Sequence, residues 1–389
     1  MKPGLPRTVW ALGVVSLCMD LSSELVHSLL PVYMTAVLGA SMLAVGLIEG
    51  IAEATASVMR AFSGALSDRL GRRKPLVVLG YGLAALSKPL FPLAASLAPV
   101  LAARFLDRIG KGIRGAPRDA LIADVTPPEL RGAAYGLRQA LDTVGAVLGP
   151  LAAIGLMLLL ASDIRAVFWL AAVPAALAVA VLVAFVREPA GAHAPRPSCN
   201  PLARASLARL GAHFWLIVAL GSVLTLARFS EAFLVLRAQD LGLAAALVPL
   251  TLVIMNLVYT GVAYPAGIAA DRGHRRVLLF WGLAALIAAD LVIAATASLA
   301  ALFAGVVLWG AHMGLTQGLL SALVAEAAPP DLRGTAFGVF HLASGLALLA
   351  ASLLAGWLWA LAGPTWTFAA GAAFAAAALA GLLGAAKSR

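Results

Sequence analysis

The stretch Pro-Pro-Glu-Leu-Arg-Gly at residues 127–132 occurs almost unchanged a second time and decides the fold. It returns as Pro-Pro-Asp-Leu-Arg-Gly at residues 329–334, and the Tyr-Gly pair at 135–136 returns as Phe-Gly at 337–338, both at an offset of 202 residues. A separate block at 64–69 recurs at 267–272, one residue out of that register. Two blocks that share nearly one offset indicate an internal repeat of about half the chain.

The composition indicates a membrane protein. Of the 389 residues, 62% are hydrophobic and only 12% are charged, which is roughly half the charged fraction of a soluble domain. These values exclude an ordinary soluble enzyme, a disordered chain and a nucleic-acid-binding domain. The net charge of +10 must therefore be explained by topology rather than by a nucleic-acid partner. The two cysteines, Cys18 and Cys199, form neither a disulfide framework nor a metal motif.

Twelve apolar segments are long enough to cross a bilayer, which requires about 20 residues each. They fall at 9–37, 41–66, 75–95, 98–120, 133–160 and 165–186, and again at 213–236, 243–269, 277–297, 299–323, 335–360 and 364–386. The sequence therefore predicts an all-α membrane protein with an N-terminal six-helix bundle at 1–186, a polar cytoplasmic linker at 187–211 and a C-terminal six-helix bundle at 212–389. Because six spans preserve orientation, the two bundles are parallel repeats.

The loop charges predict the orientation in the membrane. Lysines and arginines crowd the loops on the side of the N-terminus, whereas the opposite loops carry Arg165 and Arg237. Positively charged loops stay on the cytoplasmic side, so we expect both termini in the cytoplasm.

A loop motif gives the fold a family. The loop after the second predicted span reads Gly-Ala-Leu-Ser-Asp-Arg-Leu-Gly-Arg-Arg at 64–73, and a degenerate copy at 267–276 follows the eighth span. The pattern resembles the cytoplasmic Gly-x-x-x-Asp-Arg-x-Gly-Arg-Arg motif of the major facilitator superfamily, and with the repeat the resemblance covers essentially the whole chain. It is similar to the twelve-helix bacterial type, that of the drug and metabolite proton antiporters. The resemblance implies two bundles around a central cavity, lined by helices one, four, seven and ten, and transport by alternating access.

In that family the motif acts as a cytoplasmic gate, in which a carboxylate holds the halves together on the inside. We expect Arg72 and Asp124 to be partners in this relay. The alternative is that the residues only anchor the inner surface by their positive charge. The predicted gate comprises Gly64, Asp68, Arg69, Gly71, Arg72, Arg73 and Asp124, with Asp271, Arg275 and Glu326 as the second copy.

The fifth span contains a packing motif, Gly145-x-x-x-Gly149-Pro150. Small residues let helices pack closely and proline bends a helix. The pattern resembles the core of the superfamily's antiporter motif, although the further glycines of that motif are missing here. Antiport and generic small-residue packing therefore both remain open.

Ionisable residues inside a span are costly and should face protein or water. In the first span Asp20, Glu24 and His27 share one helical face, which we expect to line the cavity. Neighbouring buried carboxyls can exchange protons near neutral pH, which is the logic of proton-coupled antiport. The alternatives are pairing with arginines of the fourth span, favoured for Asp20, and direct binding of substrate.

The fourth span is the most basic, with Arg108, Lys111 and Arg114 predicted to serve coupling or to attract an anionic substrate. The alternative for Arg108 is a purely structural ion pair. Arg108 and Lys111-Gly112 resemble the family's Arg-x-x-Gln-Gly pattern, with lysine in place of glutamine. Glu53 of the second span is counted with this cavity group, its other reading being an ion-paired helix seam. Arg138 and Asp142 are expected to pair with each other, and Lys88 to pair locally or to extend to the membrane surface.

The second half carries fewer polar groups within its spans. Its predicted cavity residues are Arg228, Glu231, Asn256, Tyr259, Trp309, His312, Met313, Gln317 and His341. The histidines are scattered without ligand spacing, so no metal site is predicted. No cofactor and no enzyme activity are predicted either, because neither a phosphate-binding loop nor a zinc-protease motif occurs.

We therefore predict a monomeric, multi-pass secondary transporter of the bacterial inner membrane that exports a small molecule in exchange for protons. The first alternative is a proton-coupled importer or exchanger of an organic anion or a metal chelate. The second is an uncoupled lipid scramblase or a transporter-like sensor, against which the buried acids argue.

Overall fold

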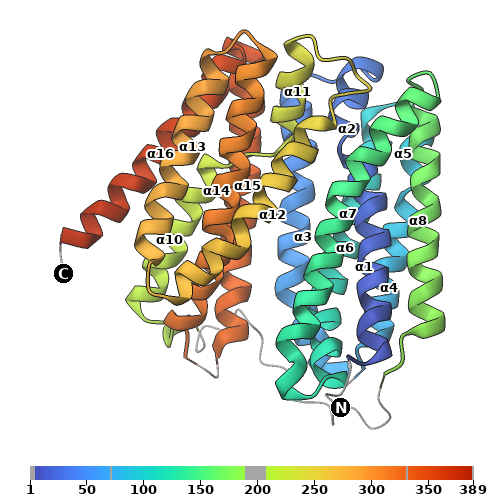
Figure 1. Ribbon diagram of the computed structural model, residues 1–389, viewed down its shortest axis with the longest axis vertical. Coiled ribbons are helices and arrows are strands. Elements are labelled where there is room, and N and C mark those ends of the chain that lie inside the picture. The colour runs from blue at the N-terminus through green and yellow to red at the C-terminus, as the bar shows by residue number, and fades with distance from the viewer. Residues whose placement is uncertain (1–4, 71, 189–206, 330–331, 388–389) are drawn as a thin grey trace. The chain divides into compact units, whose positions relative to one another are not determined.

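The computed structural model describes residues 5–70, 72–188, 207–329 and 332–387, and all regular structure within these residues is helical (Figure 1). Eleven helical segments are long and apolar enough to cross a membrane. The fourth predicted span is the helix α6 (Leu97–Val125), whose 29 residues match the others in length but carry many charges. The prediction of an all-α, twelve-helix membrane fold is confirmed.

The helices of the first half follow the predicted spans closely. They are α1 (Arg7–His27), α2 (Leu30–Val32), a π-helix (Tyr33–Val37), α3 (Met42–Leu70), α4 (Lys74–Ser87), α5 (Leu90–Leu93), α6, a 3-10 turn (Pro128–Leu130), α7 (Arg131–Leu159) and α8 (Ile164–Phe185). Those of the second half are α10 (Ala212–Ala227), α11 (Ala232–Asp240), α12 (Leu250–Asp271), α13 (Arg275–Ala295), α14 (Leu299–Ala327), α15 (Arg333–Ala362) and α16 (Pro364–Lys387).

The chain forms two compact units. One comprises Met1–Leu30 with Thr55–Ala203, and the other comprises Pro31–Ala54 with Arg204–Arg389. The division between Ala203 and Arg204 falls within the predicted linker 187–211. The segment Pro31–Ala54, assigned by sequence to the N-terminal bundle, packs with the second unit because Gly46 and Gly50 of α3 lie directly against the α15 backbone at Ser352 and Leu349.

The first helix of each half is interrupted at an equivalent place. α1 ends at His27 just before Ser28, and α10 ends at Ala227, with Ser230 in the gap before α11. Ser28 and Ser230 are 202 residues apart, so the interruption itself belongs to the repeat. Each predicted span there consists of more than one helical piece.

Close packing in the first unit brings α7 onto α1. A Cβ atom built at Gly145 would lie 2.7 Å from the Leu17 carbonyl oxygen, and one at Gly149 would lie 2.6 Å from the Glu24 Cβ. Only glycine permits these approaches. The other side of α1 contributes Val9, Leu12 and Met19 to a buried core shared with α4, α6 and α8.

The second unit has an aromatic core. Phe229 lies against Phe233, Trp309 and Phe368, with ring centroids 5.3–6.2 Å apart in edge or tilted arrangements. Such pairs add to the burial of apolar area. The polar positions of this unit are therefore few, and each one has an identifiable setting.

Candidate functional site

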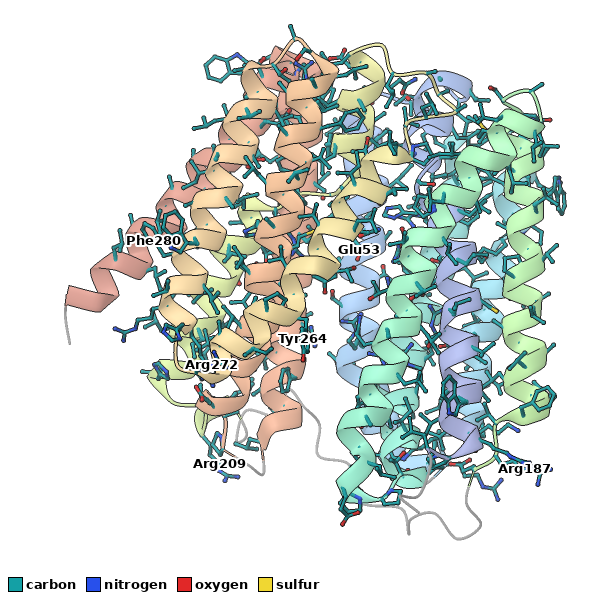
Figure 2. All side chains as sticks on the ribbon, in the orientation of Figure 1. Glu53, Arg187, Arg209, Tyr264, Arg272 and Phe280 are labelled. Atoms are coloured by element: carbon teal, nitrogen blue, oxygen red, sulfur yellow. The ribbon has the colours of Figure 1, made fainter. Side chains whose placement is uncertain are left out.

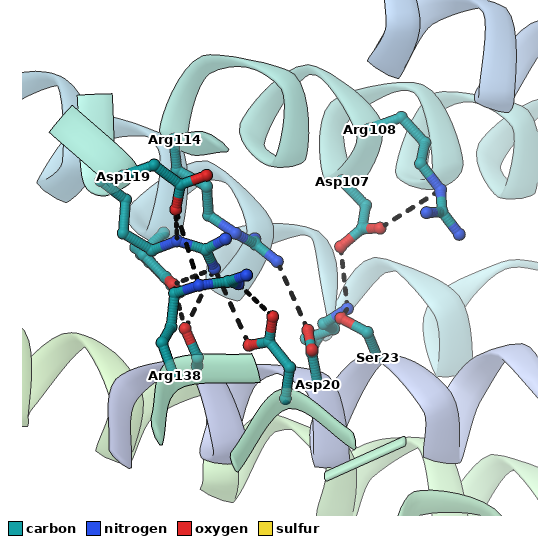
Figure 3. A network of polar contacts seen from close by, with 12 residues as sticks. Asp20, Ser23, Asp107, Arg108, Arg114, Asp119 and Arg138 are labelled. Carbon is teal, nitrogen blue, oxygen red and sulfur yellow. Dashed lines mark hydrogen bonds and ion pairs between the residues drawn. The ribbon is translucent and has the colours of Figure 1, made fainter. Parts of the chain in front are cut away.

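The candidate site of the first unit begins on α1, where the side chains of Asp20, Glu24 and His27 project from one face. Glu24 Oε2 lies 3.6 Å from His27 Nδ1, and Asp20 Oδ1 lies 3.8 Å from the guanidinium of Arg114 on α6 (Figure 3). Arg108 and Lys111 of α6 are near enough to act electrostatically on Glu24. The predicted neighbourhood of α1 acids and α6 cations is therefore present within this unit.

The glycines of α7 hold these acids in place. The Cβ that Gly145 lacks would lie 3.1 Å from the Asp20 Cβ, and the one that Gly149 lacks would meet Glu24 directly. Both carboxyl-bearing residues of α1 therefore pack over a bare stretch of α7 backbone. The packing motif and the coupling candidates, which the sequence presents as separate features, are one structural element.

Deeper on α6 lies an ion pair that is almost completely buried. Lys88 Nζ, at the end of α4, is 2.8 Å from Asp107 Oδ1 and 3.0 Å from the Ser23 hydroxyl of α1. Arg108 Nε lies 3.8 Å from the other Asp107 oxygen. Lys88 is 1% exposed, so it pairs locally and does not extend to a membrane surface.

A second network lies further along α6. Arg118 donates to the Ser16 hydroxyl at 3.0 Å and to the Asp119 carboxylate at 3.2 Å, and it lies 3.9 Å from Asp142 of α7. Arg138 binds Asp142, one turn away on α7, as the i, i+4 spacing predicts. Arg138 also lies 3.7 Å from Asp119.

Tyr81 of α4 links the Arg118 network to Arg114, the partner of Asp20. Its hydroxyl lies 3.2 Å from the Ser16 hydroxyl, and the Arg114 guanidinium stacks over its ring at 4.5 Å from the centroid, a cation–π contact. Sequence reasoning missed Tyr81, Asp107 and Asp119 as members of this site. Their signal was the excess of cations on α6, which demands partners, but the identity of those partners depends on helix pairing.

The second unit has a smaller charged group at the interruption between α10 and α11. Arg228 interacts electrostatically with Glu231, Tyr259 of α12 and Glu53 of α3. Asn256 lies one turn before Tyr259 on the same helix, and Thr260 and Tyr264 continue an exposed polar stripe there. Thr260 and Tyr264 are the residues of this stripe that sequence analysis did not select.

The residues predicted on α14 lie in the core of the unit. Trp309 and His312 are fully buried and Met313 is 6% exposed. The His312 Nδ1 lies 2.8 Å from the Gly282 carbonyl oxygen of α13 and donates to it, since a carbonyl can only accept. On α15, His341 stacks against Phe337. The Gln317 side chain is not among those that the structure describes.

Both copies of the loop motif form the same ion pair. Arg73 Nε lies 2.5 Å from Asp124 Oδ2, and Arg275 Nη1 lies 2.6 Å from Glu326 Oε1, 202 residues further on. The relay in this structure therefore runs through Arg73, whereas Arg72, the partner expected for Asp124, is exposed. The structure does not describe the remaining predicted gate residues beyond the backbone of Gly64, Asp68, Arg69 and Asp271. Gly71 lies outside the described residues altogether.

Glu188 adds a contact of the first copy that the sequence did not predict. Its carboxylate accepts hydrogen bonds from the backbone amides of Arg73 at 2.5 Å and of Lys74 at 3.3 Å. These amides have no partner within the helix at the start of α4, where negative charge is favourable.

Figure 2 shows Arg187 at the end of the first unit where α1 begins, and Arg209 and Arg272 together at one end of the second unit.

The long apolar helices and the repeat together define a multi-pass membrane protein built from two related halves. The family model of the major facilitator superfamily matches residues 12–236 and 228–387. The chain belongs to this superfamily. Among the residues described, no three histidine, cysteine or acidic side chains gather as metal ligands would.

Relatives cover nearly the full chain. An MFS-type transporter of Methanocaldococcus jannaschii is 34% identical over 95% of this chain and 93% of its own length. The inner membrane transport protein YajR of Escherichia coli is 28% identical over 97% of this chain and 82% of its own. Among solved structures, a POT family transporter in complex with 5-aminolevulinic acid superimposes with a TM-score of 0.80 at 15% identity, covering 98% of this chain and 96% of the other. These similarities indicate a transporter rather than an enzyme.

Proposed function

We propose that this protein is a secondary active transporter that exports a small molecule in exchange for protons. The observation that carries the proposal is the position of Asp20 and Glu24 on α1, where their side chains are only 27% and 22% exposed and lie within electrostatic reach of the α6 cations. Carboxyls are costly at such a place unless they serve function. An uncoupled pathway would have no use for them.

The geometry supports an exchange of partners. Asp20 interacts with Arg114 at 3.8 Å, longer than a direct hydrogen bond, so this contact can be released without loss of a tight pair. A proton on Asp20 or Glu24 would weaken the hold of the carboxyl on its neighbouring cations. Binding of substrate and binding of a proton would then compete for the same site, which is the requirement for antiport.

His27 suits the role of an intermediate proton carrier. Its ring nitrogen lies 3.6 Å from Glu24, and histidine changes charge near neutral pH. In this proposal Glu24 and His27 exchange the proton, whereas Asp20 is the partner of Arg114 on α6.

A second candidate is transport of an organic anion or a metal chelate, in either direction. The observation in its favour is the density of cations on α6, where Arg104, Arg108 and Arg114 are each less than 5% exposed. In the second unit, Arg228 would provide a further contact. Because Asp107 already neutralises part of this charge, we prefer proton exchange.

The setting of the protein is part of the same proposal. We expect a monomer in the inner membrane, with the bundles at 1–186 and 212–389, and with both termini and the linker 187–211 in the cytoplasm. The positive-inside rule supports this orientation, since Arg187 lies at one end of the first unit and Arg209 and Arg272 at one end of the second. The loop motif, through Asp68 and Asp271, would act there as the gate.

Purified protein in liposomes with an imposed pH gradient tests the proposal. Proton flux is recorded with a lumenal pH dye while cationic drugs, organic acids and metal chelates are added in turn. Antiport predicts that an exported cationic compound moves protons in the opposite direction. We expect Glu24→Gln to lose at least tenfold of the gradient-driven rate while exchange of substrate continues.

Glu129→Gln is the matched control, because Glu129 is exposed in the 3-10 turn after α6. This variant should keep the wild-type rate. A wild-type rate of gradient-driven transport in Glu24→Gln would exclude Glu24 from proton coupling. Proton flux with organic acids alone would favour the second candidate.

A further inference from the structure

A carboxyl group lies in the core of the second unit, apart from the candidate site. Asp290 belongs to the last turns of α13 and is completely buried. Its Oδ1 accepts a hydrogen bond of 3.1 Å from the indole Nε1 of Trp309 on α14. Its Oδ2 is buried and has no hydrogen-bond partner within the described parts of the chain.

The surroundings of Oδ2 are apolar and close. A Cβ at Gly371 of α16 would lie 2.5 Å from this oxygen and 3.0 Å from the Phe229 ring. The carboxyl group therefore lies against a bare stretch of the α16 backbone, at the edge of the aromatic core. Any larger residue in place of Gly371 would collide with it.

The charged groups on the neighbouring helices interact with partners other than Asp290. His312 of α14 faces Gly282, and Glu326 at the far end of that helix pairs with Arg275. Arg228, next to Phe229, interacts with Glu231 and Glu53. On α12 the titratable side chains described are Tyr259 and Tyr264, of which Tyr259 belongs to the Arg228 group, and α16 has no ionisable residue between 364 and 386.

The repeat shows what is unusual about this arrangement. Asp290 and Trp309 occupy the positions of Lys88 and Asp107, each 202 residues further on. In the first unit, a lysine on the earlier helix donates to a carboxylate on the later one. In the second unit, the carboxyl is on the earlier helix and the donor is on the later one. Donor and acceptor have therefore exchanged helices between the two units, and only in the first unit do the two side chains neutralise each other.

An ionised carboxylate without a counter-charge is very costly in an apolar interior. A metal cation would not compensate the charge well here, because hard cations require several oxygen ligands. The contacts described around the carboxyl group are the Trp309 indole, the Phe229 ring and the α16 backbone at Gly371. A proton requires only one oxygen. It removes the charge and leaves Oδ1 to accept from Trp309.

We propose that Asp290 is a proton-binding site of the second unit, separate from the carboxyls of α1. The proton lies on Oδ2, and the Trp309 N–H group holds the carbonyl oxygen Oδ1. This inference does not depend on the substrate, on the direction of transport or on the role of Glu24.

Infrared spectroscopy of the full chain at neutral pH tests the site. The spectrum of Asp290→Asn is subtracted from that of the wild type. We expect the loss of one carboxylic-acid C=O band, which shifts in heavy water because its proton exchanges. Loss of a carboxylate band instead would overturn the proposal.

Two further variants make the test specific. Asp163→Asn removes an exposed carboxylate at the N-terminus of α8, where asparagine caps equally well, and it should remove a carboxylate band. Trp309→Phe should keep the acid band and shift it to higher frequency, because the hydrogen bond to Oδ1 is lost. An unchanged band in Trp309→Phe would refute the assignment even if Asp290→Asn does not fold.

Sodium or potassium is the alternative occupant. The acid band of the wild type should keep its intensity when either salt is added at constant pH. Replacement of that band by a carboxylate band on addition of salt would show that a metal cation, rather than a proton, belongs at Asp290.

Discussion

Lys88 and Asp107 show how a lysine can be buried in a membrane protein. Both side chains are at most 5% exposed, so each has lost its hydration, and each is stabilised mainly by the other. The ammonium group also donates a hydrogen bond to the Ser23 hydroxyl, and Arg108 lies beside the second carboxylate oxygen. The pair ties α4 to α6 and to α1 at one point.

Removal of one partner should be much worse than removal of both. We expect Lys88→Met to destabilise the protein by about 3–5 kcal/mol, since Asp107 is left as a buried charge, whereas Lys88→Met with Asp107→Leu recovers most of the loss. The measurement is the melting temperature in detergent, with Arg187→Met at the exposed end of α8 as control. Equal losses in the single and double variants would show that packing, not charge, is responsible.

At the level of elements, α1 and α7 form the contact on which the candidate site depends. Gly145 and Gly149 lie one turn apart on α7 and directly against Asp20 and Glu24, so that α7 presents no side chains where these acids pack. An antiporter-like motif thus has a local task in this structure, which is to let α1 lie close enough for its carboxyls to face α6.

Gly149→Ala should therefore affect coupling as well as stability. The added methyl would lie 2.6 Å from the Glu24 Cβ, which forces the helices apart and costs about 1–3 kcal/mol. We expect a several-fold loss of proton-driven transport in liposomes. Gly155→Ala on the same helix meets no atom within 4 Å and should stabilise α7 by about 0.5–1 kcal/mol. Similar behaviour of the two variants would contradict the positioning role.

Helix identity could be predicted from the sequence, but helix interruption could not. The apolar runs predicted all twelve spans, and the i, i+4 spacing predicted the Arg138–Asp142 pair. The interruptions at Ser28 and Ser230 could not be located from hydropathy, because each lies inside a segment that is apolar enough as a whole to cross a membrane. The partners of Lys88 and Arg118 could not be predicted from the sequence either, since they depend on which residues of two packed helices lie opposite each other.

At the level of the whole molecule, duplication preserves geometry more strictly than chemistry. The ion pair after the second span is repeated after the eighth with its spacing intact. The interior contact of α4 with α6 is repeated between α13 and α14 with its charges exchanged for a carboxyl–indole bond. The sequence predicted that both copies of the motif carry gate arginines, whereas the pairing of Asp124 with Arg73 rather than Arg72 required the loop conformation.

The two copies of the loop ion pair should differ in strength. Both side chains of Arg73–Asp124 are 14% exposed, whereas those of Arg275–Glu326 are 32% and 61% exposed. Solvent screens the second pair, which should contribute about 0–1 kcal/mol. We expect Asp124→Asn to cost about 1–3 kcal/mol, as for a charged hydrogen bond that is lost away from water.

Melting temperatures at low and high salt decide the comparison. Asp124→Asn should lower the melting temperature under both conditions, whereas Glu326→Gln should differ little from wild type once salt is high. A larger effect of Glu326→Gln would mean that the second copy is the stronger contact.

The position of Glu188 has a practical consequence for dividing the chain. Because this carboxylate completes the start of α4, a cut or an inserted reporter domain placed after it leaves that helix end satisfied within the N-terminal fragment. A break placed before Glu188 would separate the cap from the helix it serves. Residues 189–206 are thus the stretch in which to split the gene for co-expression of the two halves as separate polypeptides.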